Sequence, residues 1–195
     1  MTGIRVLLCI TAGYLFGNFH TSILISRTFF HDDVRQHGSG NAGSTNMVRV
    51  YGWLPGLCTF LGDFIKAVVA AQLGSLLGGT DGACICGAAE VLGHCFPVFF
   101  KFKGGKGVAS SLGLAYIVHP AGALIVTALA GALFYFTKRI SICSLIGIFA
   151  FFLTAVLFGM PASVKLLAAF LVILVWWQHR ENIKRIPKGE EKPLI

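Results

Sequence analysis

The chain has 195 residues, of which 55% are hydrophobic and only 12% are charged, and its mean hydropathy is +0.77. Soluble domains carry about 25% charged residues, so this composition excludes an ordinary soluble protein and indicates a chain that crosses a membrane several times. The formal net charge is +8. Against so apolar a background, this charge favours anionic lipid and anionic substrates as partners, and no nucleic-acid recognition motif accompanies it.

The N-terminal apolar run, residues 3–26, could be mistaken for a secretory signal, because Arg5 precedes its most apolar part. No small-x-small cleavage site follows, and the apolar character continues to Ser26. We therefore expect a retained first transmembrane helix. Further apolar runs of spanning or near-spanning length lie at residues 54–77, 82–100, 107–137, 140–160 and 163–178.

The run at residues 107–137 is the ambiguous one. Its 31 residues would form a helix of about 46 Å, too long for one comfortable crossing and short for two. His119-Pro120 lies near its middle, where proline removes a backbone donor and disfavours helix at the preceding residue. Two arrangements follow: six crossings with one long tilted helix, or seven elements with residues 107–118 and 121–137 as a short hairpin. The shorter piece would reach only about 18 Å, so we expect it to end inside the protein.

The distribution of Lys and Arg decides between them, because these residues concentrate in cytoplasmic loops. With seven elements and the N-terminus outside, 14 of the 16 Lys and Arg residues lie on the cytoplasmic side, leaving Arg5 and Lys165 on the other. We therefore predict an all-α polytopic membrane protein of about seven transmembrane or half-membrane helices, with one domain over residues 1–195 and a cytoplasmic C-terminus. Three polar segments then face the cytoplasm together: the first (residues 38–49), the second (residues 94–110) and the third (residues 179–192).

The first polar segment begins Gly38-Ser-Gly-Asn-Ala-Gly-Ser-Thr-Asn46 and continues to Arg49. Glycines allow backbone N–H groups to turn toward an oxyanion, and the hydroxyl and carboxamide side chains add neutral donors. The same residues are also common in plain turns. An anion-binding loop and a structural turn therefore both fit this segment.

The second polar segment contains Lys101-Phe-Lys-Gly-Gly-Lys-Gly107, directly before an apolar run. This order places backbone amides and ammonium groups at a helix N-terminus, which favours phosphate, although a flexible membrane anchor fits as well. It is not a Walker A loop, because Gly107 stands where Ser or Thr should follow. His94, near the end of the third apolar run, is either functional or a hydrogen-bonded histidine of the bundle.

The third polar segment follows Trp176-Trp177, an interfacial aromatic pair. On a continuing helix, His179 and Asn182 share one face by their i, i+3 spacing. A basic tail that binds anionic lipid is the alternative, and the two roles are compatible.

Other polar residues lie within the apolar runs. Asp63 and Lys66 are i, i+3 neighbours and are expected to pair, since either alone would be costly to bury. Glu90 has no cation near it in the sequence, and no role follows for it. The six cysteines lie in or beside apolar runs and are interpreted as unpaired packing residues, with no metal site.

Residues 38–46, 94–110 and 179–192 together closely resemble the three signature motifs of the bacterial acyl-phosphate:glycerol-3-phosphate acyltransferase family of the PlsY type, and Asp63-x-x-Lys66 fits it as well. The resemblance implies transfer of a fatty acyl group from acyl phosphate to the 1-hydroxyl of glycerol 3-phosphate. The products would be lysophosphatidic acid and phosphate, in the first step of phospholipid synthesis. It further implies a multi-pass protein of the bacterial inner membrane, with a cytoplasmic active site and no metal or organic cofactor.

Two positions depart from the family pattern. Gly17-Asn18-Phe19-His20 stands where the family usually has Gly-Ser-Ile-Pro, so any role of that serine and proline is in question. Glu90 occupies a position where the family tends to have a small residue.

The expected mechanism is positioning and charge stabilisation, because no histidine has an aspartate five residues later to form a His/Asp dyad. The general base is His94, His179 or a substrate phosphate oxygen. A transporter for a phosphorylated metabolite is the alternative function, although no inverted repeat supports it. The residues assigned to catalysis are Ser39, Asn41, His94, Lys106 and His179. Those assigned to substrate binding are Gly38, Gly40, Gly43, Thr45, Asn46, Arg49, Lys103, Gly104, Gly105, Gly107 and Asn182, with Asp63 and Lys66 as orienting residues.

Overall fold

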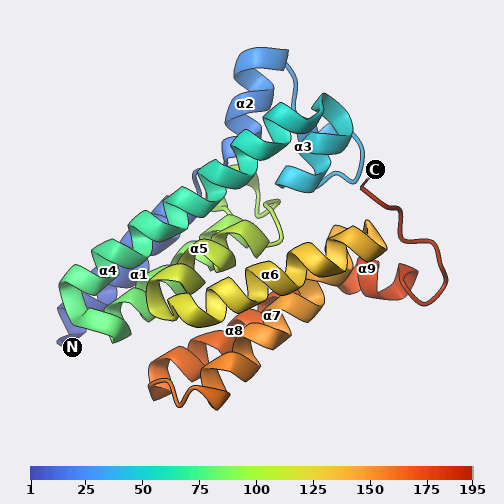
Figure 1. Ribbon diagram of the computed structural model, residues 1–195. Helices are drawn as coiled ribbons and strands as arrows, with labels where there is room; N and C mark the ends of the chain where they lie inside the picture. Colours follow the sequence, from blue (N-terminus) through green and yellow to red (C-terminus); the bar gives the residue numbers. More distant parts are fainter. Residues whose placement is uncertain (195) are drawn as a thin grey trace.

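A computed structural model describes residues 1–194, and all the regular secondary structure in that range is helical (Figure 1). Four helical stretches in this range are long and apolar enough to cross a membrane: Gly3–Phe30, Trp53–Phe100, Pro120–Thr137 and Ile140–Leu157. The elements are α1 (Gly3–Gly17), α2 (Thr21–Phe30), η1 (Val34–Gln36), α3 (Ser44–Tyr51), α4 (Trp53–Cys95), η2 (Val98–Phe100), α5 (Val108–Val118), α6 (Pro120–Thr137), α7 (Ile140–Leu157), α8 (Ala162–Gln178) and α9 (Arg180–Arg185).

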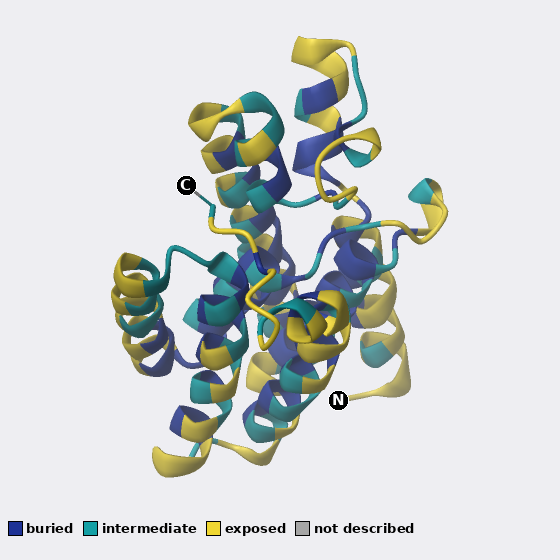
Figure 2. Ribbon diagram, turned by 90° about the vertical axis from the view of Figure 1, so that its right-hand side faces the viewer, coloured by how far each residue is buried: buried dark blue, intermediate teal, exposed yellow. Residues whose placement is uncertain are grey.

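Large apolar side chains cover the outside of the helices. Leu76, Phe136 and Leu157 are each at least 80% exposed, and Figure 2 shows exposed residues on the outer faces and buried ones where helices meet. In water such a surface would promote association, whereas hydrocarbon chains cover it without penalty. The protein is therefore a multi-pass membrane protein.

Helix α4 consists of two arms joined by a glycine turn. Gly78 and Gly79 have non-helical backbone angles, with φ +59° at Gly79. The arms run back along each other (Figure 1) and approach so closely that a Cβ on Gly74 or Gly82 would collide with the other residue's carbonyl oxygen. The two apolar runs expected at 54–77 and 82–100 are thus confirmed as separate helical arms.

The run at residues 107–137 is divided at the predicted place. Helix α5 ends at Val118, and α6 begins at Pro120, whose missing N–H is no loss at the first position of a helix. Seven of the 11 residues of α5 are buried, so this short helix is enclosed by protein, as its length requires.

The predicted first transmembrane run, residues 3–26, is divided into two helices, which together form the candidate membrane span Gly3–Phe30. Helix α1 ends at Gly17, and α2 starts at Thr21 after a three-residue link in which Asn18 is still helical and His20 is extended. Lys66 Nζ donates to the carbonyl oxygens of Gly17 at 3.1 Å and Phe19 at 2.7 Å. A buried ammonium therefore satisfies carbonyl groups that lose their helical partners at the break.

The three polar segments lie at the same end of the molecule. Figure 1 shows the N-terminus and the turn of α4 at one end, and α2, α3, α9 and the C-terminus at the other. The number of crossings and the orientation across the membrane remain predictions.

Candidate active site

A cavity of about 290 Å³ opens between the three polar segments. Its lining comes from helices and loops far apart in the chain, so the segments meet in space as the charge distribution predicts. The predicted residues that line it are Ser39, Asn41, Gly43, Thr45, Asn46, Arg49, His94, Lys106, Gly107, His179 and Asn182, together with Asp63. Those that the structure places outside the lining are Gly38, Gly40, Lys103, Gly104, Gly105 and Lys66.

Asn46 holds the first polar segment in shape. Its side-chain nitrogen donates to the carbonyl oxygens of Val34, His37 and Asn41 at 3.0–3.1 Å, and its Oδ1 accepts from the N–H of Ser39 at 2.9 Å. The buried carboxamide is therefore fully used by the loop. Asn46 therefore orients Ser39 toward the cavity, while its own polar side-chain atoms are all hydrogen-bonded within the protein.

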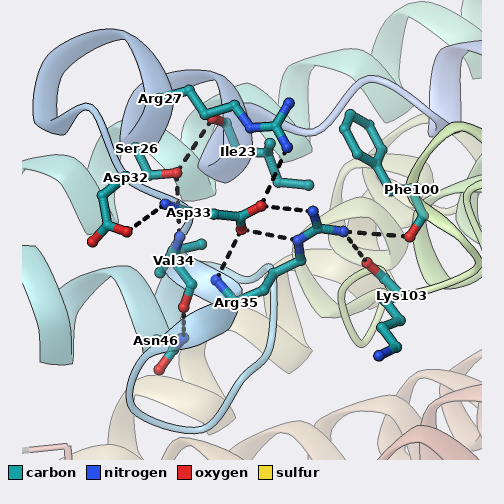
Figure 3. Close-up of polar contacts among 10 residues, drawn as sticks. All are labelled: Ile23, Ser26, Arg27, Asp32, Asp33, Val34, Arg35, Asn46, Phe100 and Lys103. Carbon is teal, nitrogen blue, oxygen red and sulfur yellow. Dashed lines mark hydrogen bonds and ion pairs between the residues drawn. The ribbon is translucent and has the colours of Figure 1, made fainter.

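An arginine clasp of Arg35 and Asp33, just before the first polar segment, ties this part of the chain to the second segment (Figure 3). Arg35 makes a bidentate pair with Asp33, at 2.7 Å and 2.9 Å. It also donates to the carbonyl oxygens of Phe100 at 3.3 Å and Lys103 at 3.5 Å. Hydrogen bonds from Arg35 hold the pKa of Asp33 well below its usual range. Neither member of this pair is among the predicted site residues.

The glycines of the second segment allow close packing against the end of α4. A Cβ on Gly104 would collide with the carbonyl oxygen of His94, and one on Gly105 with the Nε2 of the same histidine. The N–H of Gly105 donates to the carbonyl oxygen of His94 at 3.0 Å. These glycines therefore bring Lys106 and Gly107 to the cavity. The backbone amide of Gly105 is used in a structural hydrogen bond.

Two helix N-termini open on the cavity. Ser44 and Thr45 start α3, Val108 and Ala109 start α5, and all four line the cavity. The first N–H groups of a helix lack intrahelical partners and carry its positive end, which suits phosphate.

Lys106 supplies a cation beside these helix ends. Burial lowers the pKa of Lys106 to about 8, with the carboxylate of Glu191 opposing this shift and the neighbouring arginines adding to it. Its Nζ contacts the side-chain oxygen of Asn182, whose nitrogen donates to Glu191 Oε1 at 2.7 Å. The carboxamide is thus oriented with its oxygen toward the ammonium group.

His179 lies in the cavity wall as a neutral imidazole. Its Nδ1 is 2.8 Å from the carbonyl oxygen of Val175, and because a carbonyl only accepts, Nδ1 carries the proton and Nε2 an open lone pair. Burial and the charge of Lys106 lower the pKa of His179 to about 4. At neutral pH it can accept a proton.

The third polar segment closes one side of the cavity through Glu191, which is not among the predicted site residues. Glu191 is buried and accepts from Ser141 at 2.8 Å, from Asn182 and from Arg185 at 2.9 Å. Arg49 donates to the carbonyl oxygen of Lys192 at 3.2 Å. Two adjacent carboxylates, Glu190 and Glu191, within an otherwise basic tail are the signal that could have identified it.

A buried ionic group lies behind the cavity. The predicted pair of Asp63 and Lys66 is confirmed at 3.4 Å. The same Lys66 lies 3.6 Å from Glu90, which also accepts a hydrogen bond from Ser110 at 3.1 Å. Tertiary packing thus supplies the cation that Glu90 lacks in the sequence.

Comparison with known proteins is decisive for the family. A family profile described as glycerol-3-phosphate acyltransferase matches residues 7–189. The chain belongs to this family. It is 38% identical over 190 residues to the glycerol-3-phosphate acyltransferase of Alkaliphilus metalliredigens, covering 96% of this chain and 95% of that one. The enzyme of Finegoldia magna is 39% identical over 186 residues, with 93% and 92% covered.

Two solved acyltransferase structures match this chain over nearly its whole length. A crystal structure of PlsY (YgiH), an integral membrane glycerol 3-phosphate acyltransferase, in its glycerol 3-phosphate form superposes with a TM-score of 0.92 and 35% identity, covering 96% of this chain and 94% of that one. Its lysophosphatidic acid form gives a TM-score of 0.89 and 34% identity, with the same coverage. These matches confirm the resemblance drawn from the three polar segments.

Both departures from the family pattern lie next to His94 or Lys66 of this acyltransferase. The ring of His20 stacks on that of His94 with 5.0 Å between centroids, and Glu90 flanks Lys66. Within residues 1–194, neither lines the cavity.

Proposed function

We propose that the protein transfers a fatty acyl group from acyl phosphate to the 1-hydroxyl of glycerol 3-phosphate, which gives lysophosphatidic acid and inorganic phosphate. Membership of the family supports acyl transfer, and the two solved relatives are described in a glycerol 3-phosphate form and a lysophosphatidic acid form. The observation that carries the proposal is one cavity into which two helix N-termini and the cations Lys106 and Arg49 converge. Both substrates carry a phosphate group, and this cavity has the chemistry to hold two.

In the proposed complex, the helix N-termini of α3 and α5, Lys106 and Arg49 bind the phosphates of donor and acceptor. Ser39, Asn41 and Asn182 orient the glycerol. The apolar part of the wall, from Trp53, Leu57 and Phe60 of α4, receives the start of the acyl chain.

The chemical step joins the 1-hydroxyl oxygen to the carbonyl carbon of the mixed anhydride. The new C–O ester bond forms as the bond between the carbonyl carbon and the phosphate oxygen breaks, and phosphate leaves with the electron pair. His179 takes the hydroxyl proton on Nε2, because this nitrogen has the open lone pair. Lys106 and the amides at the start of α5 stabilise the developing oxyanion.

We place the protein in the bacterial inner membrane as a single domain, with the cavity facing the cytoplasm, where glycerol 3-phosphate is dissolved. The 14 to 2 division of Lys and Arg supports this orientation. Anionic membrane lipid is then a further partner of the basic tail of the third polar segment.

The test is direct assay of the full chain in detergent micelles with radiolabelled glycerol 3-phosphate and palmitoyl phosphate. We expect labelled lysophosphatidic acid and one phosphate per turnover, and a loss of about 100-fold or more in Lys106→Ala. Lys101→Ala is the matched control, since Lys101 is exposed and outside the cavity lining. Near-normal turnover by Lys106→Ala would contradict the phosphate role. Binding of glycerol 3-phosphate without covalent product would favour the transporter.

A further inference from the structure

His94 and Lys66 form a contact that determines where the histidine carries its proton. Lys66 Nζ lies 2.9 Å from His94 Nδ1, and both residues are buried. The same ammonium group donates to the carbonyl oxygens of Gly17 and Phe19. An ammonium group has three hydrogens and no acceptor, so these three partners use all of them. Nδ1 of His94 must therefore accept, and its proton resides on Nε2.

The surroundings oppose any other arrangement. A proton on Nδ1 would point at the hydrogens of the ammonium group, and the nearest carboxylate, Asp63 Oδ1 at 3.9 Å, is beyond hydrogen-bonding distance. Asp63 and Glu90 lie 3.4 Å and 3.6 Å from Nζ. These two carboxylates pair with the amine, which offsets part of the cost of burying the group.

The protonated nitrogen lies next to the phosphate-binding loop. A Cβ on Gly105 would collide with His94 Nε2, so this nitrogen lies against the Cα of the residue before Lys106. His94 itself lines the cavity. Its Nε2–H is therefore placed as a hydrogen-bond donor at the cavity edge, whereas His179 contributes an acceptor.

We propose that Lys66 is a positioning residue that holds His94 as a hydrogen-bond donor, so that His94 Nε2–H binds a phosphate or acyl oxygen of a substrate and does not act as the base. The role in turnover rests on the proposed acyl transfer, whereas the protonation state of His94 can be measured independently of it. Glu90 and Asp63 support the arrangement by pairing with Lys66 and holding its side chain in place.

The first measurement is ¹⁵N NMR of the full chain in micelles with labelled histidine, with the His94 signals identified by their loss in His94→Gln. We expect a protonated Nε2 and an unprotonated Nδ1 in the wild type, and a mixture of the two neutral forms in Lys66→Met. A proton on Nδ1 in the wild type would overturn the proposal. This measurement stands even if the protein shows no acyl transfer, which would refute the proposed function alone.

The second measurement compares His94→Gln with His94→Asn. The amide nitrogen of Gln reaches the place of Nε2 and can donate there, whereas that of Asn lies near the place of Nδ1, and neither residue can serve as a base. We expect His94→Gln to keep at least a tenth of the wild-type kcat/KM and His94→Asn to lose about 100-fold. Equal loss of activity in two folded variants would instead make His94 the base and refute the donor role.

Discussion

Lys106 Nζ contacts the side-chain oxygen of Asn182, a residue 76 positions later in the chain. The contact joins the second polar segment to the third at the cavity. Because Glu191 holds the nitrogen of the same carboxamide, the oxygen can point only toward Lys106. Residues of the third polar segment therefore set the position of the Lys106 ammonium group.

Replacing Asn182 by Asp tests this relationship. The carboxylate would form an ion pair with Lys106 and repel substrate phosphates, so we expect kcat/KM for glycerol 3-phosphate to fall by about 100-fold, mostly through KM. Glu181→Gln, at the exposed neighbouring position, is the control and should stay near the wild-type value. Steady-state kinetics in micelles would measure both, and an unchanged KM in Asn182→Asp would contradict the assignment.

The lowered pKa of Lys106 predicts a pH dependence. The side chain is a cation below its pKa of about 8 and neutral above it, so kcat/KM should decline as the pH rises through about 8. Lys106→Arg should shift this decline upward, beyond the range of the assay, because guanidinium titrates only above about 12. An unchanged wild-type kcat/KM between pH 7 and pH 9.5 (about one and a half units above the pKa) would contradict the requirement for a charged Lys106.

Gly105→Ala tests the close packing on His94. The added Cβ would displace the histidine ring, so we expect a loss of activity of about 100-fold together with a lower thermal midpoint. In Gly131→Ala the Cβ meets open space within α6, and alanine stabilises a helix by about 0.5–1 kcal/mol relative to glycine. Thermal unfolding in detergent should therefore change in opposite directions for the two variants.

The clasp of Asp33 and Arg35 should be important for stability. Arg35→Lys removes the bidentate pair and the ties to the second segment, with an expected cost of about 1–3 kcal/mol. Arg27→Lys is the matched control, since Arg27 is a largely exposed partner of the same carboxylate and should cost less than about 1 kcal/mol. Because the pKa of Asp33 is lowered on folding, its contribution is present above pH 4 (about the usual Asp pKa) and is lost on further acidification. Equal effects of the two variants on chemical unfolding would contradict this role.

The orientation in the membrane can be tested by labelling. In a Cys58→Ser background, which removes the exposed native thiol, Lys101→Cys should react with an impermeant maleimide only in inside-out vesicles. Lys165→Cys should react only in right-side-out vesicles. Labelling of both from the same side would rule out the predicted topology.

Several structural features could be predicted from residues near one another in the chain. The length of the apolar runs and the proline after His119 act locally, and most of the resulting helices end close to the expected residues. The three polar segments could be grouped because the charge of each loop constrains its side of the membrane. Their meeting around one cavity followed from that grouping.

Other features depend on contacts between residues that lie far apart in the chain. Only the tertiary structure determines them. Lys66 binds the carbonyl oxygen of Gly17 at the break after α1 across 49 positions, and Glu90 gains its cation in the same way. The sequence by itself determined a multi-pass helical acyltransferase with three polar segments at one end, because apolar length, charge and motif order are properties of the chain. The hydrogen-bond roles of His94 and His179 depend on folding, because a hydrogen-bond partner is chosen by the atoms that packing brings within about 3 Å.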